Sequence, residues 1–182
     1  LSRHRGAHRH PGEFKREQNM IGGADLRTAR FIPPPPRETL DCMSDLERYI
    51  NRQPAPSPGQ ALLDLALVHY QFETIHPFAD GNGRVGRMLI SLMTVTGGLL
   101  DMPALYLSPA IEHQKDRYID AMYAVSSKGH WTAWVRFFCE AICTSCAQTI
   151  ATIDRLIALE NEYRERVTAI KSGNAGTMVS ML

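Results

Sequence analysis

The stretch "SPGQALLDLALVHYQFETIHP", residues 57–77, predicts the central helix of the fold. Ser57 is a favourable N-cap, Pro58 suits the first helical position, and Gln60 can close a capping box. The residues that follow are apolar almost all round the helix, a pattern typical of a helix buried at the centre of its domain. The proline at the end disfavours helical backbone in the residue before it, so we expect the helix to end at His76.

Helical signals continue on both sides of this segment. Apolar residues between Met43 and Ile50 keep helical spacing. Downstream we expect a helix from about Gly83 to Gly97-Gly98, another from Ser108 to Lys128, and one long helix or two abutting ones from Trp131 to about Ile170, where neither Pro nor Gly occurs. The predicted fold class is therefore all-α, a helical bundle with one small β-hairpin.

The hairpin is predicted in residues 21–36, "IGGADLRTARFIPPPP". The Gly22-Gly23 pair permits a tight turn, Thr28 to Ile32 is typical of a short strand, and four prolines continue as extended chain. Proline lacks the N–H that a sheet ladder needs, so this strand should lie at an edge. We divide the chain into a basic N-terminal segment (1–12), one domain (13–170) and a C-terminal tail (171–182).

Composition is that of an ordinary globular protein. The chain has 182 residues, 44% of them hydrophobic and 21% charged, enough for one domain with its own core. A net charge of +1 gives no argument for nucleic acid or an anionic membrane, and the apolar stretches Ala61–Val68 and Met88–Val95 are too short to span a bilayer. We expect a cytoplasmic protein that binds neither membrane nor nucleic acid, with its four cysteines reduced.

The residues after the central helix, "FADGNGRVGR" (78–87), suit the binding of a phosphate. Glycines at positions 81 and 83 let main-chain N–H groups approach a ligand closely, and the following helix presents its positive end. Arg84 and Arg87 share one face of its first turn and add two planar donor groups for phosphate oxygens. The stretch therefore predicts an anion cradle.

Two residues beside the cradle add chemistry. Asp80 is a hard oxygen ligand, and Mg²⁺ is commonly held by one carboxylate plus substrate phosphates. His76 titrates near neutral pH and can take a proton from an incoming hydroxyl. Each residue alone also fits an ordinary structural role, but paired arginines at a helix start oppose the helix dipole unless an anion joins them. Together these residues favour a site for a nucleotide polyphosphate and its metal.

The stretch from His76 to Arg87, "HPFADGNGRVGR", resembles the signature of the Fic (filamentation induced by cAMP) family, His-Pro-Phe-x-Asp/Glu-Gly-Asn-Gly-Arg-x-x-Arg, at every defined position. The segments "PGEFKREQNMIGG", "ARFIPPPP" and "GHWTAWVRFF" are also similar to Fic domains, so the resemblance runs from about Pro11 to about Ile170. It implies the Fic fold, a helical bundle whose hairpin flap (about 21–36) lies next to the active-site loop (76–87).

The resemblance implies a protein adenylyltransferase, which moves AMP from ATP to a Ser, Thr or Tyr hydroxyl of a target protein, or of itself, and releases pyrophosphate. His76 would be the general base and Asp80 would hold Mg²⁺. Asn82 and the glycines would cradle the α-phosphate, and the arginines would bind the β and γ phosphates. The implied nucleotide-binding residues are Gly81, Asn82, Gly83, Arg84, Val85, Gly86, Arg87, Tyr118 and Ile119. Many relatives carry a Tyr-Tyr pair at the last two of these positions, where this chain has Tyr118 and Ile119. The resemblance therefore implies an adenine pocket that works by shape, without a hydrogen bond from a second tyrosine.

In Fic relatives the flap docks a target segment as an added strand. The implied docking residues are Thr28, Ala29, Arg30, Phe31 and Ile32. Many Fic proteins also restrain themselves with a helix bearing Ser/Thr-x-x-x-Glu-Gly/Asn. The nearest pattern in this chain, Ser108 to Glu112, is followed by His113 instead. The resemblance therefore implies an inhibitory helix upstream in the full-length protein.

Three function classes stay open. The first is AMP transfer to protein. The second is another transfer on the same scaffold, of UMP or phosphocholine; Doc-like kinases carry Lys in place of the first motif glycine, which is Gly81 here. The third is a non-catalytic binding module, against which His76 and the complete cradle argue.

Overall fold

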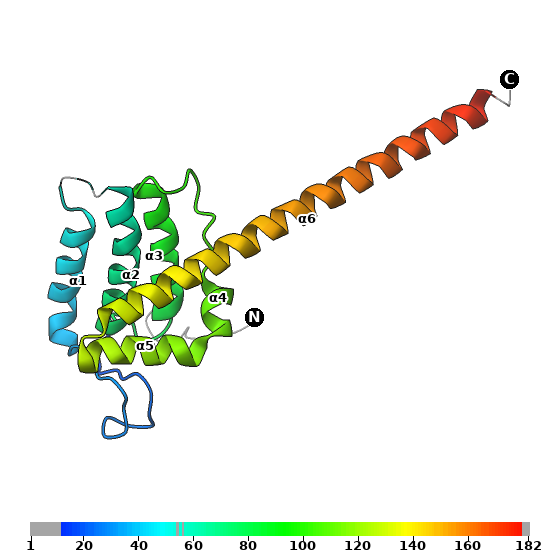
Figure 1. Cartoon of the computed structure of the whole chain (residues 1–182). Helices are drawn as coiled ribbons and strands as arrows, with labels where there is room; N and C mark the ends of the chain where they lie inside the picture. Colours follow the sequence, from blue (N-terminus) through cyan, green and yellow to red (C-terminus); the bar gives the residue numbers. More distant parts are fainter. Residues whose placement is uncertain (1–11, 54, 56, 180–182) are drawn as a thin grey trace. The chain divides into compact units, whose positions relative to one another are not determined.

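The computed structural model describes residues 12–53, 55 and 57–179, with side chains up to residue 170. Except for Gly12, the predicted basic N-terminal segment lies outside the described residues. The described helices are α1 (Pro36–Ile50), α2 (Pro58–Ile75), α3 (Asn82–Thr96), α4 (Ser108–His113), α5 (Lys115–Lys128) and α6 (Trp131–Val179) (Figure 1). The chain divides into two compact units, one ending at Ser145 and the other beginning at Cys146.

Helix α2 packs against both α1 and α3 in the first unit (Figure 1). Its N-terminus has the predicted cap, in which the Ser57 N–H donates to Gln60 Oε1 at 3.0 Å. Buried residues occur all round the helix, polar as well as apolar, so the prediction of a central helix is confirmed. His76 follows as the C-cap residue, as predicted, and its backbone is left-handed, with φ 49° and ψ 58°.

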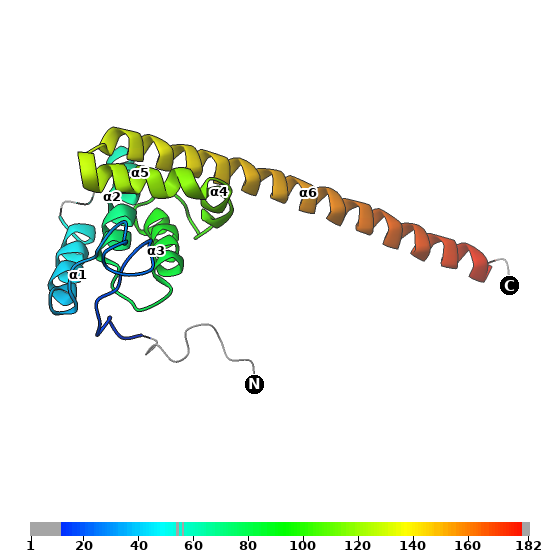
Figure 2. The same cartoon turned by 90° about the horizontal axis from the view of Figure 1, so that it is seen from below.

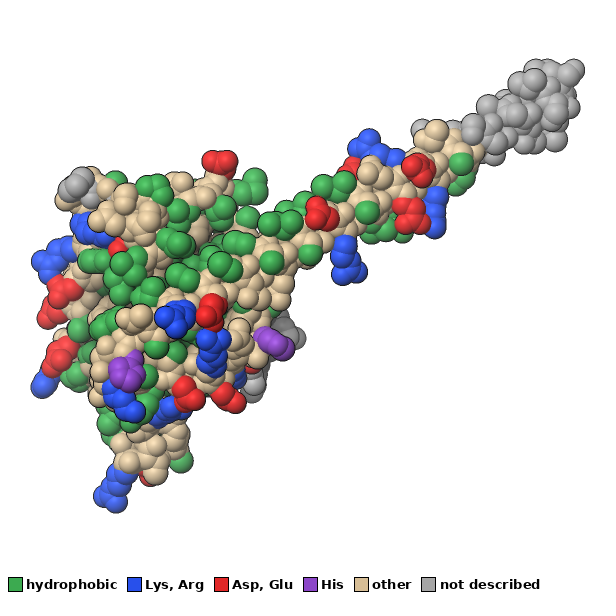
Figure 3. All heavy atoms as spheres, viewed as in Figure 1, with side chains coloured by type: hydrophobic (Ala, Val, Ile, Leu, Met, Phe, Trp, Pro, Cys, Tyr) green, Lys and Arg blue, Asp and Glu red, His purple; other side chains and the backbone are tan. Residues whose placement is uncertain are grey.

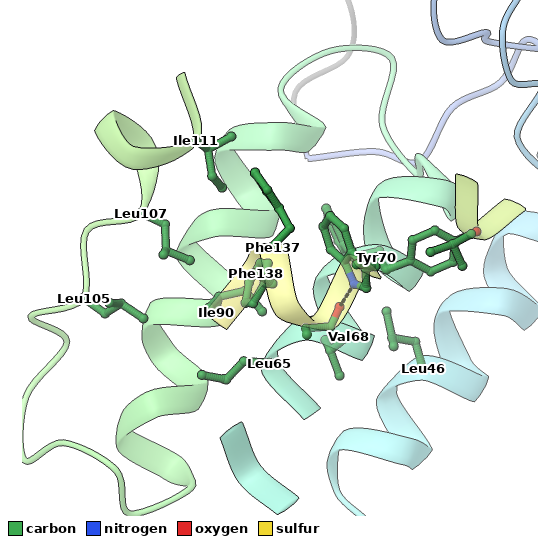
Figure 4. Close-up of a cluster of buried hydrophobic side chains, with 14 of the residues drawn as sticks. Leu46, Leu65, Val68, Tyr70, Ile90, Leu105, Leu107, Ile111, Phe137 and Phe138 are labelled. Carbon is green, nitrogen blue, oxygen red and sulfur yellow. Dashed lines mark hydrogen bonds between the residues drawn. The ribbon is translucent and has the colours of Figure 1, made fainter. Parts of the chain in front are cut away.

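The core of the first unit forms where α2 and α3 meet the first turns of α6. Trp134, Phe137 and Phe138 are buried in this core. Figure 4 shows Phe137 and Phe138 close to Ile90 of α3. The Trp134 indole N–H donates to the main-chain oxygen of Ala66 at 2.9 Å, so the polar group of this buried ring has a hydrogen-bond partner. The predicted all-α bundle is confirmed.

The hairpin predicted over residues 21–36 is wrong, and so is its strand from Thr28 to Ile32. In place of a strand, this part of the described chain has an isolated antiparallel bridge between Ile21 and Phe31. The two N–H···O distances of the bridge are 2.9 and 3.1 Å. Residues 21–31, which we call the flap loop, therefore form a loop closed by one bridge (Figure 2, dark blue).

A local turn explains why the strand does not form. The Asp25 carboxylate accepts hydrogen bonds from the N–H groups of Arg27 and Thr28, both at 2.9 Å. The Thr28 hydroxyl in turn accepts the Ala24 N–H at 3.0 Å. Side-chain hydrogen bonds of this kind compete with a sheet ladder for the same main-chain donors. The residues at the start of the expected strand therefore form a turn instead.

Two later helices differ from prediction. The helix expected from Ser108 to Lys128 is broken at Gln114, whose φ of −120° and ψ of 34° lie outside the helical range. Helix α6 is continuous and runs past the expected end at Ile170. Its Trp131–Ile170 part is long and apolar enough to cross a membrane, whereas our prediction considered only Ala61–Val68 and Met88–Val95 and judged both too short. Length and composition are weak evidence, because the first turns of the same helix belong to the buried core.

The second unit is the part of α6 from Cys146 onward. Its described apolar side chains are exposed, and Figure 3 shows them interspersed with acidic and basic side chains. Ion pairs one helical turn apart, Glu160–Arg164 and Glu162–Arg166, support the helix in this part of the chain.

Candidate active site

The turn between α2 and α3 places the predicted catalytic histidine at a pocket. His76 ends α2, and Gly81, with φ 86°, precedes α3. That backbone conformation suits glycine, so the turn can be tight. A pocket of about 100 Å³ opens between the flap loop, the end of α2 and α5. Five of the predicted site residues line it: Arg30, Phe31, His76, Tyr118 and Ile119.

The His76 ring is held in the form that a general base needs. Its Nδ1 lies 3.1 Å from the main-chain oxygen of Glu73. A carbonyl oxygen can only accept, so Nδ1 carries the proton and Nε2 of the neutral ring is the nitrogen free to take one. Burial lowers the pKa of His76, the bond to Glu73 opposes this, and the charge of Lys15 lowers the pKa further. The ring is therefore neutral at pH 7.

The Asn82 side chain is engaged with the loop itself. Its Oδ1 accepts the Phe78 N–H and its Nδ2 donates to the Phe78 oxygen, both at 2.8 Å. The side chain is buried. The contact between Asn82 and the α-phosphate stays a prediction. The first N–H groups of a helix have no partner within it, so the main chain at the start of α3 can supply donors to the same phosphate.

The two motif arginines of α3 differ in exposure and in hydrogen-bond partner. Arg84 is 66% exposed, and its Nη2 lies 3.8 Å from Asp80 Oδ2. Arg87 is half-buried, and its Nε donates to the Ser108 hydroxyl at 2.9 Å. The sequence indicates Ser108 as a helix start and as the first residue of the Ser108 to Glu112 pattern, and neither reading predicts that it orients Arg87.

Asp80 is the one carboxylate of the loop 76–87. Its Oδ1 accepts the Gly81 N–H at 2.7 Å, and the side chain is 46% exposed, so it can reach a ligand. No group of three or more His, Cys, Asp or Glu side chains converges as a metal site within the described residues. An exposed carboxylate such as that of Asp80 fits Mg²⁺ together with phosphate oxygens, which is the usual way that proteins hold the ion on a nucleotide.

A buried polar layer beneath the cradle was also missed. His69 Nε2 lies 3.1 Å from the Tyr118 hydroxyl, so that hydroxyl is already engaged while its ring lines the pocket. In the described part of the chain, His69 Nδ1 and Glu73 Oε1 are buried without a hydrogen-bond partner. Burial, helped by the Arg87 charge, lowers the pKa of His69 to about 3. Burial raises the pKa of Glu73 to about 7 against the opposing charge of Arg87.

Comparison with protein families gives one match, over residues 2–94, to the family described as Fic/DOC. The matched range covers just over half of the chain and contains the whole 76–87 loop. The chain belongs to the Fic/DOC family. The resemblance inferred from the Fic motif is thereby confirmed.

Individual Fic proteins extend the likeness beyond that range. Protein adenylyltransferase Fic from Drosophila melanogaster is 30% identical over 180 residues, covering 94% of this chain and 33% of the relative. The protein of the same name from Drosophila virilis is 26% identical over 172 residues, 94% of this chain and 31% of its own. The chain thus spans about a third of the length of these curated relatives.

A solved Fic structure shows the same fold. The crystal structure of a Fic family protein from Desulfovibrio desulfuricans G20 matches with a TM-score of 0.64 and 25% identity, over 78% of this chain and 41% of that one. The helical Fic fold implied by the motif is confirmed, without the hairpin that we had expected with it.

Proposed function

We propose that this Fic/DOC chain is the catalytic domain of a protein adenylyltransferase, which transfers AMP from ATP to a protein hydroxyl. One observation carries the proposal: the His76 Nδ1 bond to the Glu73 oxygen leaves Nε2 as a proton acceptor beside the pocket that Tyr118 and Ile119 line. The names of the curated relatives point to the same activity.

The chemistry follows from these positions. His76 Nε2 accepts the proton of the target hydroxyl, whose oxygen attacks the α-phosphorus of ATP. The bond from that phosphorus to the bridging oxygen breaks, and pyrophosphate leaves. The first turn of α3 and its two arginines bind the phosphates, and Tyr118 with Ile119 offers an apolar wall to the adenine. Mg²⁺, held by Asp80 and the phosphates, would neutralise part of the negative charge.

The target, which can be another protein or a second site on this one, would approach along the flap loop. Arg30 and Phe31 already line the pocket, and Arg30 is fixed by an ion pair with Asp120 and by the ring of Tyr123, 4.7 Å away. Of the other predicted docking residues, Thr28 and Ile32 are exposed and Ala29 is half-buried. Docking here does not require a preformed strand.

The test is which phosphate of ATP, the α or the γ, becomes covalently attached to protein. The protein is incubated with cell extract and ATP labelled at the α or at the γ phosphate, and the protein-bound label is counted. We expect α-label on protein, and a loss of about 10²–10⁴-fold in rate for His76→Ala, the range typical of losing a general base.

His76→Ala should still bind ATP and should unfold at the temperature of the parent protein, which separates lost chemistry from lost structure. Incorporation of the γ-label would identify a kinase and would contradict AMP transfer. Covalent α-label undiminished in His76→Ala would show that another residue is the base.

A further inference from the structure

The catalytic turn adopts a conformation that its own sequence does not favour. His76 is the one non-glycine residue with positive φ in the described part of the chain. A left-handed backbone is disfavoured for residues with a Cβ, and such strain persists where surrounding contacts impose it. The contacts that impose it here come from residues 15 and 19, far away in the sequence.

Four successive carbonyl groups of the turn accept hydrogen bonds from Lys15 and Asn19. The Lys15 Nζ donates to the oxygen of residue 75 at 3.0 Å, and the Lys15 N–H donates to that of residue 77 at 2.8 Å. The Asn19 Nδ2 donates to the oxygens of residues 76 and 78, at 2.9 and 3.1 Å. The two side chains are themselves joined, with Lys15 Nζ 2.9 Å from Asn19 Oδ1. Every carbonyl from position 75 to position 78 thus accepts a hydrogen bond from Lys15 or Asn19, and the carbonyl of residue 78 also accepts one from Asn82 Nδ2 at 2.8 Å.

The cost of this arrangement argues against a purely packing role. Lys15 is only 4% exposed, and burial lowers its pKa to about 8. Its ammonium has two neutral acceptors, the Asn19 amide oxygen and a main-chain carbonyl, so no carboxylate at this contact offsets the loss of water. The ammonium does lie at the C-terminal end of α2, where a positive charge is favourable.

We propose that Lys15 and Asn19 are positioning residues for the transfer reaction. They hold the carbonyls of residues 75–78 and so fix the left-handed His76, whose ring faces the pocket. This role rests on the proposed function of His76 as the base. The proposal assigns a function to the segment "PGEFKREQNMIGG", which contains both residues and lies outside the 76–87 loop.

The first experiment compares kcat with nucleotide affinity. Asn19→Asp keeps the shape but loses the amide donor, and Lys15→Met keeps the length but loses the ammonium. For both we expect kcat of AMP transfer to fall on the order of 10- to 100-fold, the scale of a misplaced catalytic group, with the Kd for MgATP within about 3-fold of the parent value. Arg16→Ala, at an exposed neighbouring residue that pairs with Glu13, is the matched control and should change neither quantity.

Parallel losses of kcat, MgATP affinity and melting temperature would mean that the two side chains merely stabilise the fold, and would overturn the proposal. An unchanged kcat would overturn it as well. If Lys15→Met does not fold, Asn19→Asp carries the test, because its side chain is only half-buried.

The second experiment does not depend on activity. The Lys15 charge is one of the causes that lower the pKa of His76, so NMR titration of the His76 ring should give a higher pKa in Lys15→Met than in the parent. The other titratable groups in the pocket wall, Arg30, Glu73, Tyr118 and Tyr123, are the same in both proteins. An unshifted His76 pKa would overturn the proposal that Lys15 acts on His76. If the His76 pKa shifts but the parent protein transfers no AMP, the effect of Lys15 on His76 stands and the proposed function is refuted.

Discussion

Glu73 illustrates how one buried carboxyl can make the stability of the domain depend on pH. Burial raises its pKa to about 7 from a model-peptide value of 4.5, although the charge of Arg87 opposes the rise. Between these two pH values the folded chain keeps a proton that the unfolded chain releases. Stability from this group is therefore fully present below about pH 4.5 and is lost as the pH rises through about 7.

Glu73→Gln removes the titration and keeps the shape. The difference in free energy of unfolding between Glu73→Gln and the parent should shift in favour of the variant by about 1–3 kcal/mol as the pH rises from 4.5 to 8. One pKa unit corresponds to about 1.4 kcal/mol. Urea unfolding at pH 4.5, 6 and 8 measures this difference, and the contribution of His69 cancels because both proteins carry it. A difference that does not change with pH would show that the carboxyl ionises as freely in the folded chain as in the unfolded one.

Asp80 leads to a prediction about the metal. One carboxylate supplies too few ligands to hold Mg²⁺ without a nucleotide. We expect calorimetry to detect no Mg²⁺ binding to the protein alone, and Asp80→Asn to raise the Mg²⁺ concentration that half-saturates AMP transfer by about 10-fold or more. The asparagine retains an oxygen for the Gly81 N–H, so the turn should keep its form. Tight binding of Mg²⁺ in the absence of ATP would contradict this assignment.

At the scale of elements, the sequence predicts whatever is encoded locally. The cap, the apolar residues and the terminating proline of α2 all lie within the helix or next to it, and they are where the sequence indicated. The 76–87 loop is equally local, so His76, Asp80 and the arginines could be recognised from it. Residues that meet only through the fold, such as Ser108 under Arg87 and Lys15 at the end of α2, leave no comparable pattern.

Gly86 controls how closely α2 and α3 approach each other. A Cβ at this position would lie 2.6 Å from Glu73 Oε1 and 3.1 Å from a ring carbon of Phe72. Gly86→Ala should therefore destabilise the domain by about 1–3 kcal/mol, as overpacked core positions do. Gly59→Ala in the first turn of α2, where nothing lies within 4 Å, is the control and should be neutral or slightly stabilising. Equal urea midpoints for the two variants would show that α3 can move away at no cost.

At the scale of the whole molecule, the fold and the site belong to the first unit. Every residue of the hydrophobic core cluster precedes Cys146, and so does every residue assigned to the site. A chain that ends at Ile150 should therefore keep its melting temperature within about 4 °C and keep AMP transfer to a given target. Thermal unfolding followed by circular dichroism checks the first part. A loss larger than about 1 kcal/mol would assign a stabilising role to the later turns of α6.

The buried indole of Trp134 has a spectroscopic consequence. The chain contains two tryptophans, and Trp131 is 42% exposed while Trp134 is completely enclosed, with its ring 6.3 Å from that of His69 and nearly parallel to it, at 7°. The two should emit at different wavelengths, the enclosed one further to the blue. With Trp131→Phe, the remaining emission would report from the layer directly beneath the cradle. The protein thus carries its own fluorophore at the place where nucleotide binding and core packing meet.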